Sequence, residues 1–143
     1  MKHSLKIRLI YHGANVLLVG LLAGVVLMYA IDDSWGPAAV NAWRIAHTSI
    51  TLTGVAFIAM AATFDTLKLG PRAALTLFVS LMVSAYTFCI GLVIGALAGV
   101  VGLAPMGPFL NWVVFILFVI GAFAVVFGLI IFIVGARRAI RNL

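Results

Sequence analysis

An arginine, a histidine and several hydroxyl residues interrupt an otherwise apolar part of the chain, "AWRIAHTSITLTG", residues 42–54. Helical spacing places five of these residues on one face: Trp43, Arg44, His47, Thr51 and Gly54. An imidazole is a good ligand for iron, and an arginine one turn away can pair with a carboxylate. Ionisable residues inside apolar segments are costly and usually mark function. We therefore interpret this face as a candidate binding site.

A haem group suits this candidate site. His47 can ligate the iron, Arg44 can pair with a propionate, and Gly54 has no side chain and leaves room for a flat macrocycle. The alternative is an interfacial cap, in which Arg44 extends to the lipid headgroups and His47 bonds to a backbone carbonyl or water. The residues by themselves leave both interpretations open.

The elements that position this site are membrane helices. The chain is 66% hydrophobic and only 8% charged, whereas soluble domains are about half apolar and about a quarter charged. Four apolar stretches are each long enough to span a bilayer, and backbone groups in lipid must bond within the segment. The expected spans are 7–31, 40–64, 73–101 and 109–134. We therefore expect an all-α, four-helix membrane bundle that forms one domain, residues 1–143.

Basic residues set the expected orientation. Eight of the nine lie before span one, between spans two and three, or after span four, and Arg44 is the ninth. The positive-inside rule makes that side cytoplasmic, so both termini are expected on the cytoplasmic side of the membrane. Anionic lipid is a sufficient partner for the net charge of +6, and no nucleic acid is needed. The three tryptophans fall at the opposite side, as an aromatic belt would: Trp35, Trp43 and Trp112.

Several functional classes lack their residues in this sequence. The three aspartates lie near the expected span ends, so neither an acid–base hydrolase nor a pump with a buried acidic carrier is expected. Cys89 is alone, so it has no internal disulfide partner. His12 lies near the inner end of span one and His47 near the outer end of span two. At 1.5 Å per residue their depths differ by roughly 15–20 Å, so one subunit cannot place both on one iron. A single-histidine haem with an open sixth position is the better fit.

Three segments together resemble the styrene oxide isomerases, a family of small four-helix membrane proteins. They are "YHGANVLLVGLLAGVVLM" in span one, "AWRIAHTSITLTG" in span two, and "GLAPMGP" before a final apolar span that ends in basic residues. The resemblance implies a homotrimer that holds haem b near its subunit interfaces, with His47 as the axial ligand. Ferric iron would act as a Lewis acid on a small lipophilic epoxide. The ring would open to a cation, a hydride would migrate, and an aldehyde or ketone would form.

The sequence departs from the family at its polar positions. The family has an asparagine six residues after the ligand, where this chain has Thr53. It also has an aspartate and a tyrosine eight residues apart on the third helix, where an ungapped comparison gives Ser84 and Leu92. Thr53 is the first candidate to orient the substrate oxygen, and Tyr86, the one phenol in span three, is the second. For Thr53 the alternative is a hydroxyl bonded to its own helix, and for Tyr86 a packed or interfacial ring.

Two other functional classes stay open. One is a haem-binding membrane protein without isomerase activity, such as a sensor, a haem carrier or a respiratory accessory subunit. The other is a haem-free packing or transport subunit. An absorbance spectrum of the purified protein separates the second class from the rest.

The charge asymmetry predicts the membrane topology. A reporter fused after Leu143 should be cytoplasmic, and one inserted in the loop 32–37 should lie on the opposite side, because basic residues flank only the first of these positions. Alkaline phosphatase and green fluorescent protein fusions measure this. Reporters on the same side of the membrane would contradict the predicted topology.

Overall fold

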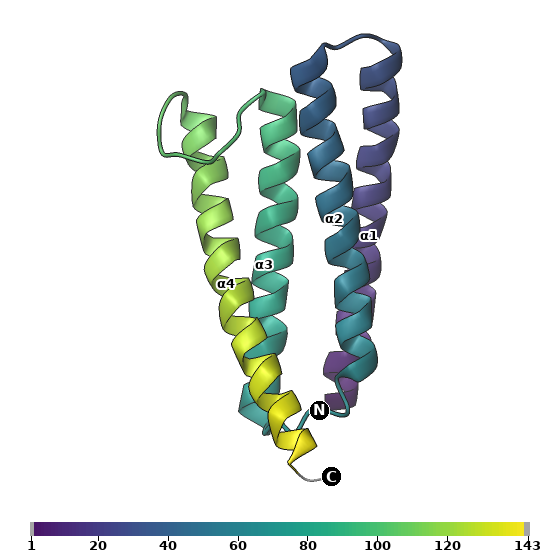
Figure 1. Cartoon of the computed structure of the whole chain (residues 1–143), viewed down its shortest axis with the longest axis vertical. Helices are drawn as coiled ribbons and strands as arrows, with labels where there is room; N and C mark the ends of the chain where they lie inside the picture. The colour runs from purple at the N-terminus through teal and green to yellow at the C-terminus, as the bar shows by residue number, and fades with distance from the viewer. Residues whose placement is uncertain (1, 142–143) are drawn as a thin grey trace.

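A computed structural model describes residues 2–141 as four helices, and this part of the chain contains no strand. The helices are α1 (Lys2–Asp32), α2 (Pro37–Thr63), α3 (Pro71–Ala98) and α4 (Phe109–Ile140). Each is long and apolar enough to cross a membrane. Helix α1 begins and α4 ends at the same end of the bundle, which we call the termini end; the opposite end is the far end (Figure 1).

Turn residues set the helix boundaries. Pro37 and Pro71 occupy the first helical position of α2 and α3, where a missing backbone N–H costs no hydrogen bond. Helix α3 ends at Ala98 because Gly99 adopts the left-handed conformation, with φ of 64°. The expected third span, 73–101, ends three residues beyond the helix for this reason. Gly99 therefore caps the helix.

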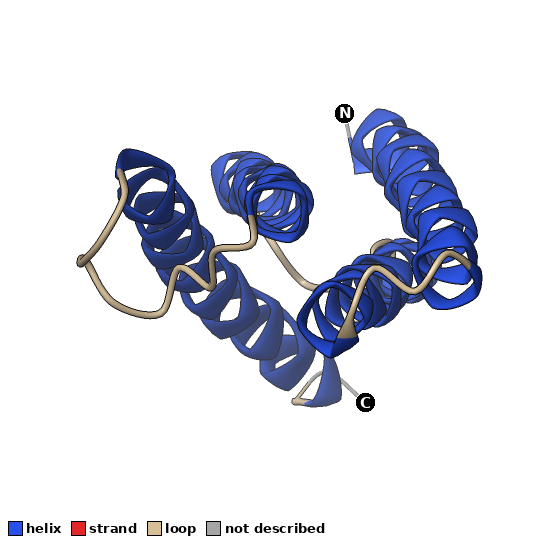
Figure 2. Ribbon diagram, turned by 90° about the horizontal axis from the view of Figure 1, so that it is seen from above, coloured by secondary structure: helices blue, strands red, loops and turns tan. Residues whose placement is uncertain are grey.

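The four helices form two antiparallel hairpins that follow one another across the bundle (Figure 2). Helix α1 packs along α2, and α3 packs along α4. Contacts between the hairpins are fewer and are made by α3 with α1 and α2. Among the described helices, α4 contacts only α3. Much of each helix surface is therefore left to face lipid or another protein chain.

Glycines bring the backbones of α1 and α2 together. A Cβ added at Gly20 would lie 2.5 Å from the backbone nitrogen of Thr51, and one at Gly54 would lie 2.5 Å from that of Leu17. Real Cβ atoms do not approach backbone this closely, so both positions require glycine. Small residues at helix interfaces allow such close packing in membranes.

Helix α4 carries its own glycine repeat, which the sequence analysis missed. Gly121, Gly128 and Gly135 are seven residues apart and all are buried. A Cβ at Gly121 would lie 2.7 Å from the Thr87 hydroxyl, and one at Gly135 would lie 2.8 Å from the Leu69 side chain. Seven-residue spacing places these glycines on one face of α4, which packs against α3 and against the loop that precedes α3.

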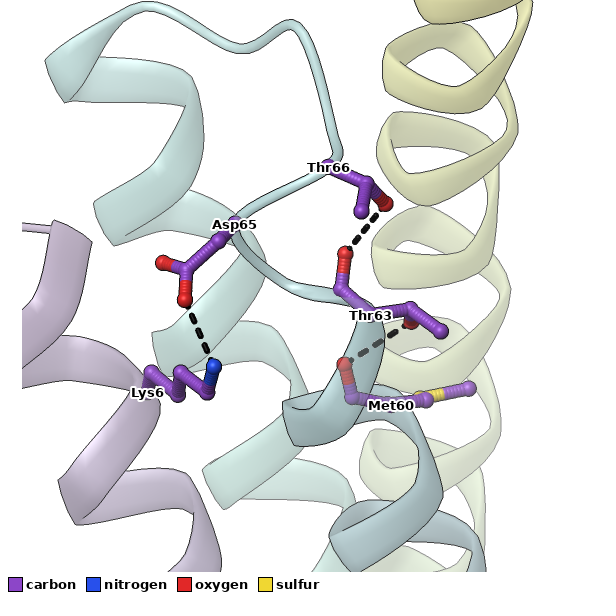
Figure 3. A network of polar contacts seen from close by, with 5 residues as sticks. All are labelled: Lys6, Met60, Thr63, Asp65 and Thr66. Carbon is purple, nitrogen blue, oxygen red and sulfur yellow. Dashed lines mark hydrogen bonds and ion pairs between the residues drawn. The ribbon is translucent and has the colours of Figure 1, made fainter.

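Polar contacts join the helices at the termini end. The Lys6 ammonium donates to the Asp65 carboxylate at 2.6 Å, and the Lys2 ammonium donates to the Leu67 carbonyl at 3.0 Å. The Thr63 hydroxyl donates to the Met60 carbonyl oxygen, and the Thr66 hydroxyl donates to the Thr63 carbonyl oxygen (Figure 3). The hydrogen bond from Lys6 lowers the pKa of Asp65. The ion pair therefore contributes to the stability of the fold above the ordinary aspartate pKa, and this contribution is lost as pH falls through the lowered pKa of Asp65.

The close approach at Gly54 predicts a stability effect. Gly54→Ala should lower the free energy of unfolding by about 1–3 kcal/mol, because the new methyl group must push the α1 backbone away. Gly70→Ala is the control, since a Cβ there meets nothing within 4 Å. Thermal unfolding in detergent, followed by circular dichroism, measures the difference. Equal midpoints for the two variants would contradict the packing assigned to Gly54.

Candidate functional site

The His47 imidazole lies between α2 and α1. Its Nδ1 is 2.8 Å from the backbone carbonyl oxygen of Gly20. A carbonyl oxygen only accepts hydrogen bonds, so Nδ1 must carry a proton and donate it. In the neutral ring, Nε2 then keeps its lone pair. A backbone acceptor on one nitrogen is the arrangement that orients many metal-binding histidines.

Glycine also fixes the position of the ring. A Cβ at Gly24 would lie 2.8 Å from both Cε1 and Nδ1 of His47, so the imidazole packs against this bare stretch of α1. Among the described residues, His47 Nε2 has no hydrogen-bond partner. It is not fully buried, because the one fully buried side-chain atom without a partner among those residues is Thr51 Oγ1. The chain thus presents an oriented imidazole nitrogen at the surface of the α1–α2 hairpin.

Arg44 and Trp43 lie beside His47 in different surroundings. Arg44 is exposed and makes no ion pair with a described residue. Trp43 is 5% exposed and packs in the core, so it does not belong to the expected aromatic belt; Trp35 and Trp112 are exposed. Three residues of helix turn through 300°, which leaves Arg44 about 60° from His47 on the wheel. Arg44 is therefore free to bind an anion near His47.

Gly54 lies where α2 packs against α1. The space that its missing side chain leaves is filled by the α1 backbone at Leu17. Within one chain, the missing side chain therefore serves helix packing and does not make room for a macrocycle, and cofactor binding by Gly54 stays a prediction. The glycines that contact or lie beside the imidazole are Gly20 and Gly24 on α1. Their four-residue spacing was visible in the sequence, but nothing there paired them with His47.

The Thr53 hydroxyl bonds to its own helix. It donates to the Ser49 carbonyl oxygen at 2.8 Å, which is the usual behaviour of threonine in an apolar helix. Six residues separate Thr53 from His47, and this places the two side chains about 120° apart around α2. Within one chain, therefore, Thr53 and His47 point in different directions.

Tyr86 bonds to His12 and is remote from His47. Its hydroxyl lies 2.7 Å from His12 Nδ1, which joins α3 to α1. His12 and Gly20, the carbonyl partner of His47, are eight residues apart on α1, or about 12 Å along the axis. The structure agrees with the depth argument that separates the two histidines. It does not bring Tyr86 beside His47, and the sequence analysis did not foresee the pairing of Tyr86 with His12.

Ser84 and Leu92 occupy the two other positions at which the family has polar residues, and their surroundings differ. Ser84 is 3% exposed and lies in the core of the bundle. Leu92 lines a cavity of about 820 Å³ at the far end, between α2 and α3. Trp35, Trp43 and Phe118 also line this cavity. Its lining is largely apolar, and its volume is in the usual range for small-molecule sites.

One comparison identifies the family. The sequence profile of styrene oxide isomerase matches residues 5–137, nearly the whole chain, including all four helices for most of their length. No curated protein and no solved structure matches. The match includes His47 with its partner Gly20, and it bears out the resemblance seen in the short motifs. The chain therefore belongs to the styrene oxide isomerase family.

Proposed function

We propose that this protein is a haem b-dependent membrane isomerase that converts a lipophilic epoxide to an aldehyde or ketone. Family membership supports the reaction class. The observation that carries the cofactor is the 2.8 Å contact between His47 Nδ1 and the Gly20 carbonyl, which leaves Nε2 as a lone-pair donor at the hairpin surface.

The residues around His47 fit a haem group. His47 would ligate the iron, and the exposed Arg44 would bind a propionate. A haem held there would supply Lewis acidity toward an epoxide oxygen. The chain's own part is to orient the imidazole through α1, to anchor the carboxylate, and to keep water from the reacting molecule with its apolar helices.

The proposed site needs a second wall. Helix α1 holds Nδ1, and Nε2 is not fully enclosed by the described residues, so we propose that a second copy in a homotrimer supplies the other side of the cofactor pocket. In an oligomer whose symmetry axis runs parallel to the helices, equivalent residues of all copies lie at the same depth in the membrane. Thr53 lies six residues, or about 9 Å along the helix axis, from His47, whereas Tyr86 stays near the depth of His12, so Thr53 of a neighbouring chain would lie closer in depth to the site than Tyr86 does. Thr53 remains the candidate that orients the substrate oxygen.

The setting of the site suits a lipophilic substrate. Large apolar side chains cover the outside of the bundle, for example Phe123, which is 75% exposed, and Ile133, which is 63% exposed. Such a surface faces lipid or other copies of the chain, and an uncharged epoxide partitions into the same apolar phase. We propose a multi-pass location in the bacterial inner membrane, with both termini cytoplasmic.

One observation favours a second candidate function. The family's three polar positions are Thr53, Ser84 and Leu92 in this chain, and the Thr53 hydroxyl is already bonded to Ser49. A haem-binding protein without isomerase activity would need only the His47 and Arg44 side of the site. The two candidates share the cofactor and differ in the reaction.

Cofactor binding gives the first test. His47→Ala should abolish the Soret band of the purified protein, because it removes the axial nitrogen, and Arg44→Ala should lower haem occupancy several-fold. His12→Ala is the control and should keep the haem, since His12 is about 12 Å away along α1. The pyridine haemochrome assay measures haem per chain. Haem lost in the His12 variant and kept in the His47 variant would show that the wrong histidine was assigned.

The reaction gives the second test. Oxidised, haem-loaded protein incubated with styrene oxide and related epoxides should form the carbonyl isomer, and His47→Ala should abolish it. Thr53→Val should lower kcat at least several-fold, because it is close in shape and lacks the hydroxyl. Gas chromatography of the products measures both. A haem-loaded protein that converts none of a broad epoxide panel would favour the non-catalytic alternative.

A further inference from the structure

A second polar site lies on the bundle surface, apart from His47. His12 on α1 and Tyr86 on α3 share a 2.7 Å hydrogen bond. Their nearest charged neighbours along the chain are Arg8, four residues before His12, and Arg72, fourteen before Tyr86. Tyr86 is 39% exposed and His12 is half-buried. The pair therefore lies at the surface of an apolar zone, where polar groups are rare and usually functional.

A count of protons shows what the pair can still bind. A neutral imidazole has one N–H and a phenol has one O–H. The shared hydrogen bond uses one of these protons, whichever ring donates it. Either the Tyr86 hydroxyl or His12 Nε2 then keeps a proton with no partner among the described residues. In an apolar setting an unpaired donor is unfavourable, so an acceptor atom is stabilised there.

Aromatic rings surround this donor. Tyr11 meets the His12 ring edge-on at a centroid distance of 5.3 Å, and Phe78 lies 6.1 Å away. The Tyr86 ring meets His12 edge-on at 5.8 Å. Tyr11 is 63% exposed. A ligand that combines an aromatic ring with one acceptor oxygen can pack on the exposed Tyr11 ring and accept the free proton at the same time.

We propose that the His12–Tyr86 pair binds the oxygen atom of a lipophilic aryl epoxide or carbonyl compound, at a site separate from His47. The choice of ligand rests on the proposed function, because epoxide and carbonyl are its substrate and product. The site lies about 12 Å along α1 from the carbonyl that holds His47. A molecule bound there is held in the membrane zone of the protein without reacting.

Infrared spectroscopy with acetophenone tests the site, because a hydrogen bond lowers the carbonyl stretching frequency of this unreactive ketone. The full-length protein in nanodiscs should give a saturable, shifted carbonyl band that is absent from empty nanodiscs. The double variant His12→Leu/Tyr86→Phe removes both donors and should weaken binding roughly two- to tenfold. Tyr29→Phe is the control, an exposed tyrosine near the other end of α1.

The outcomes separate this site from the haem site. His47→Ala should lose haem and keep the shifted band, so the absence of haem does not by itself remove the band. A band that is unchanged in the double variant, with only a lower unfolding temperature, would mean that the pair is a tie between helices and would overturn the proposal. Styrene oxide added to the His47→Ala variant should displace the ketone. Failure to displace it would overturn the epoxide part of the proposal.

Discussion

The hydrogen bond from His47 to the Gly20 carbonyl is the contact on which the proposed chemistry depends. It is worth only about 1 kcal/mol in stability, yet it decides which imidazole nitrogen keeps its lone pair. The bond exists because the α1 and α2 backbones come close. Gly20, Gly24 and Gly54 each sit where a Cβ would meet a neighbouring atom at 2.8 Å or less. The glycines thus serve packing and chemistry at once.

The same packing leaves the imidazole at a surface. Helix α1 covers one side of His47, and the hairpins contact each other through α3. Arg44 is exposed near it, and Thr53 points elsewhere on α2. We propose that a second copy of the chain completes the site. The proposed trimer would then form the cofactor pocket as well as pack the membrane helices.

The sequence predicted the four helices because they are a local property of the chain. Long apolar stretches and turn residues determine the helices. The pairing of residues across helices could not be predicted in the same way. Gly54 and Gly24 have the same side chain, and only the register of α1 against α2 shows that one faces Leu17 and the other the imidazole. Tyr86 likewise looked like a substrate-orienting group until the packing of α3 on α1 placed it at His12.

The tautomer of His47 is the most direct measure of this account. Nitrogen-15 NMR of the haem-free protein, labelled at histidine and assigned by comparison with His47→Asn, reports which ring nitrogen is protonated. The account predicts a proton on Nδ1 and, in the neutral ring, a bare Nε2, because the Gly20 carbonyl accepts only from a donor. A proton on Nε2 and a bare Nδ1 would contradict it, since the nitrogen assigned to the iron would then be blocked.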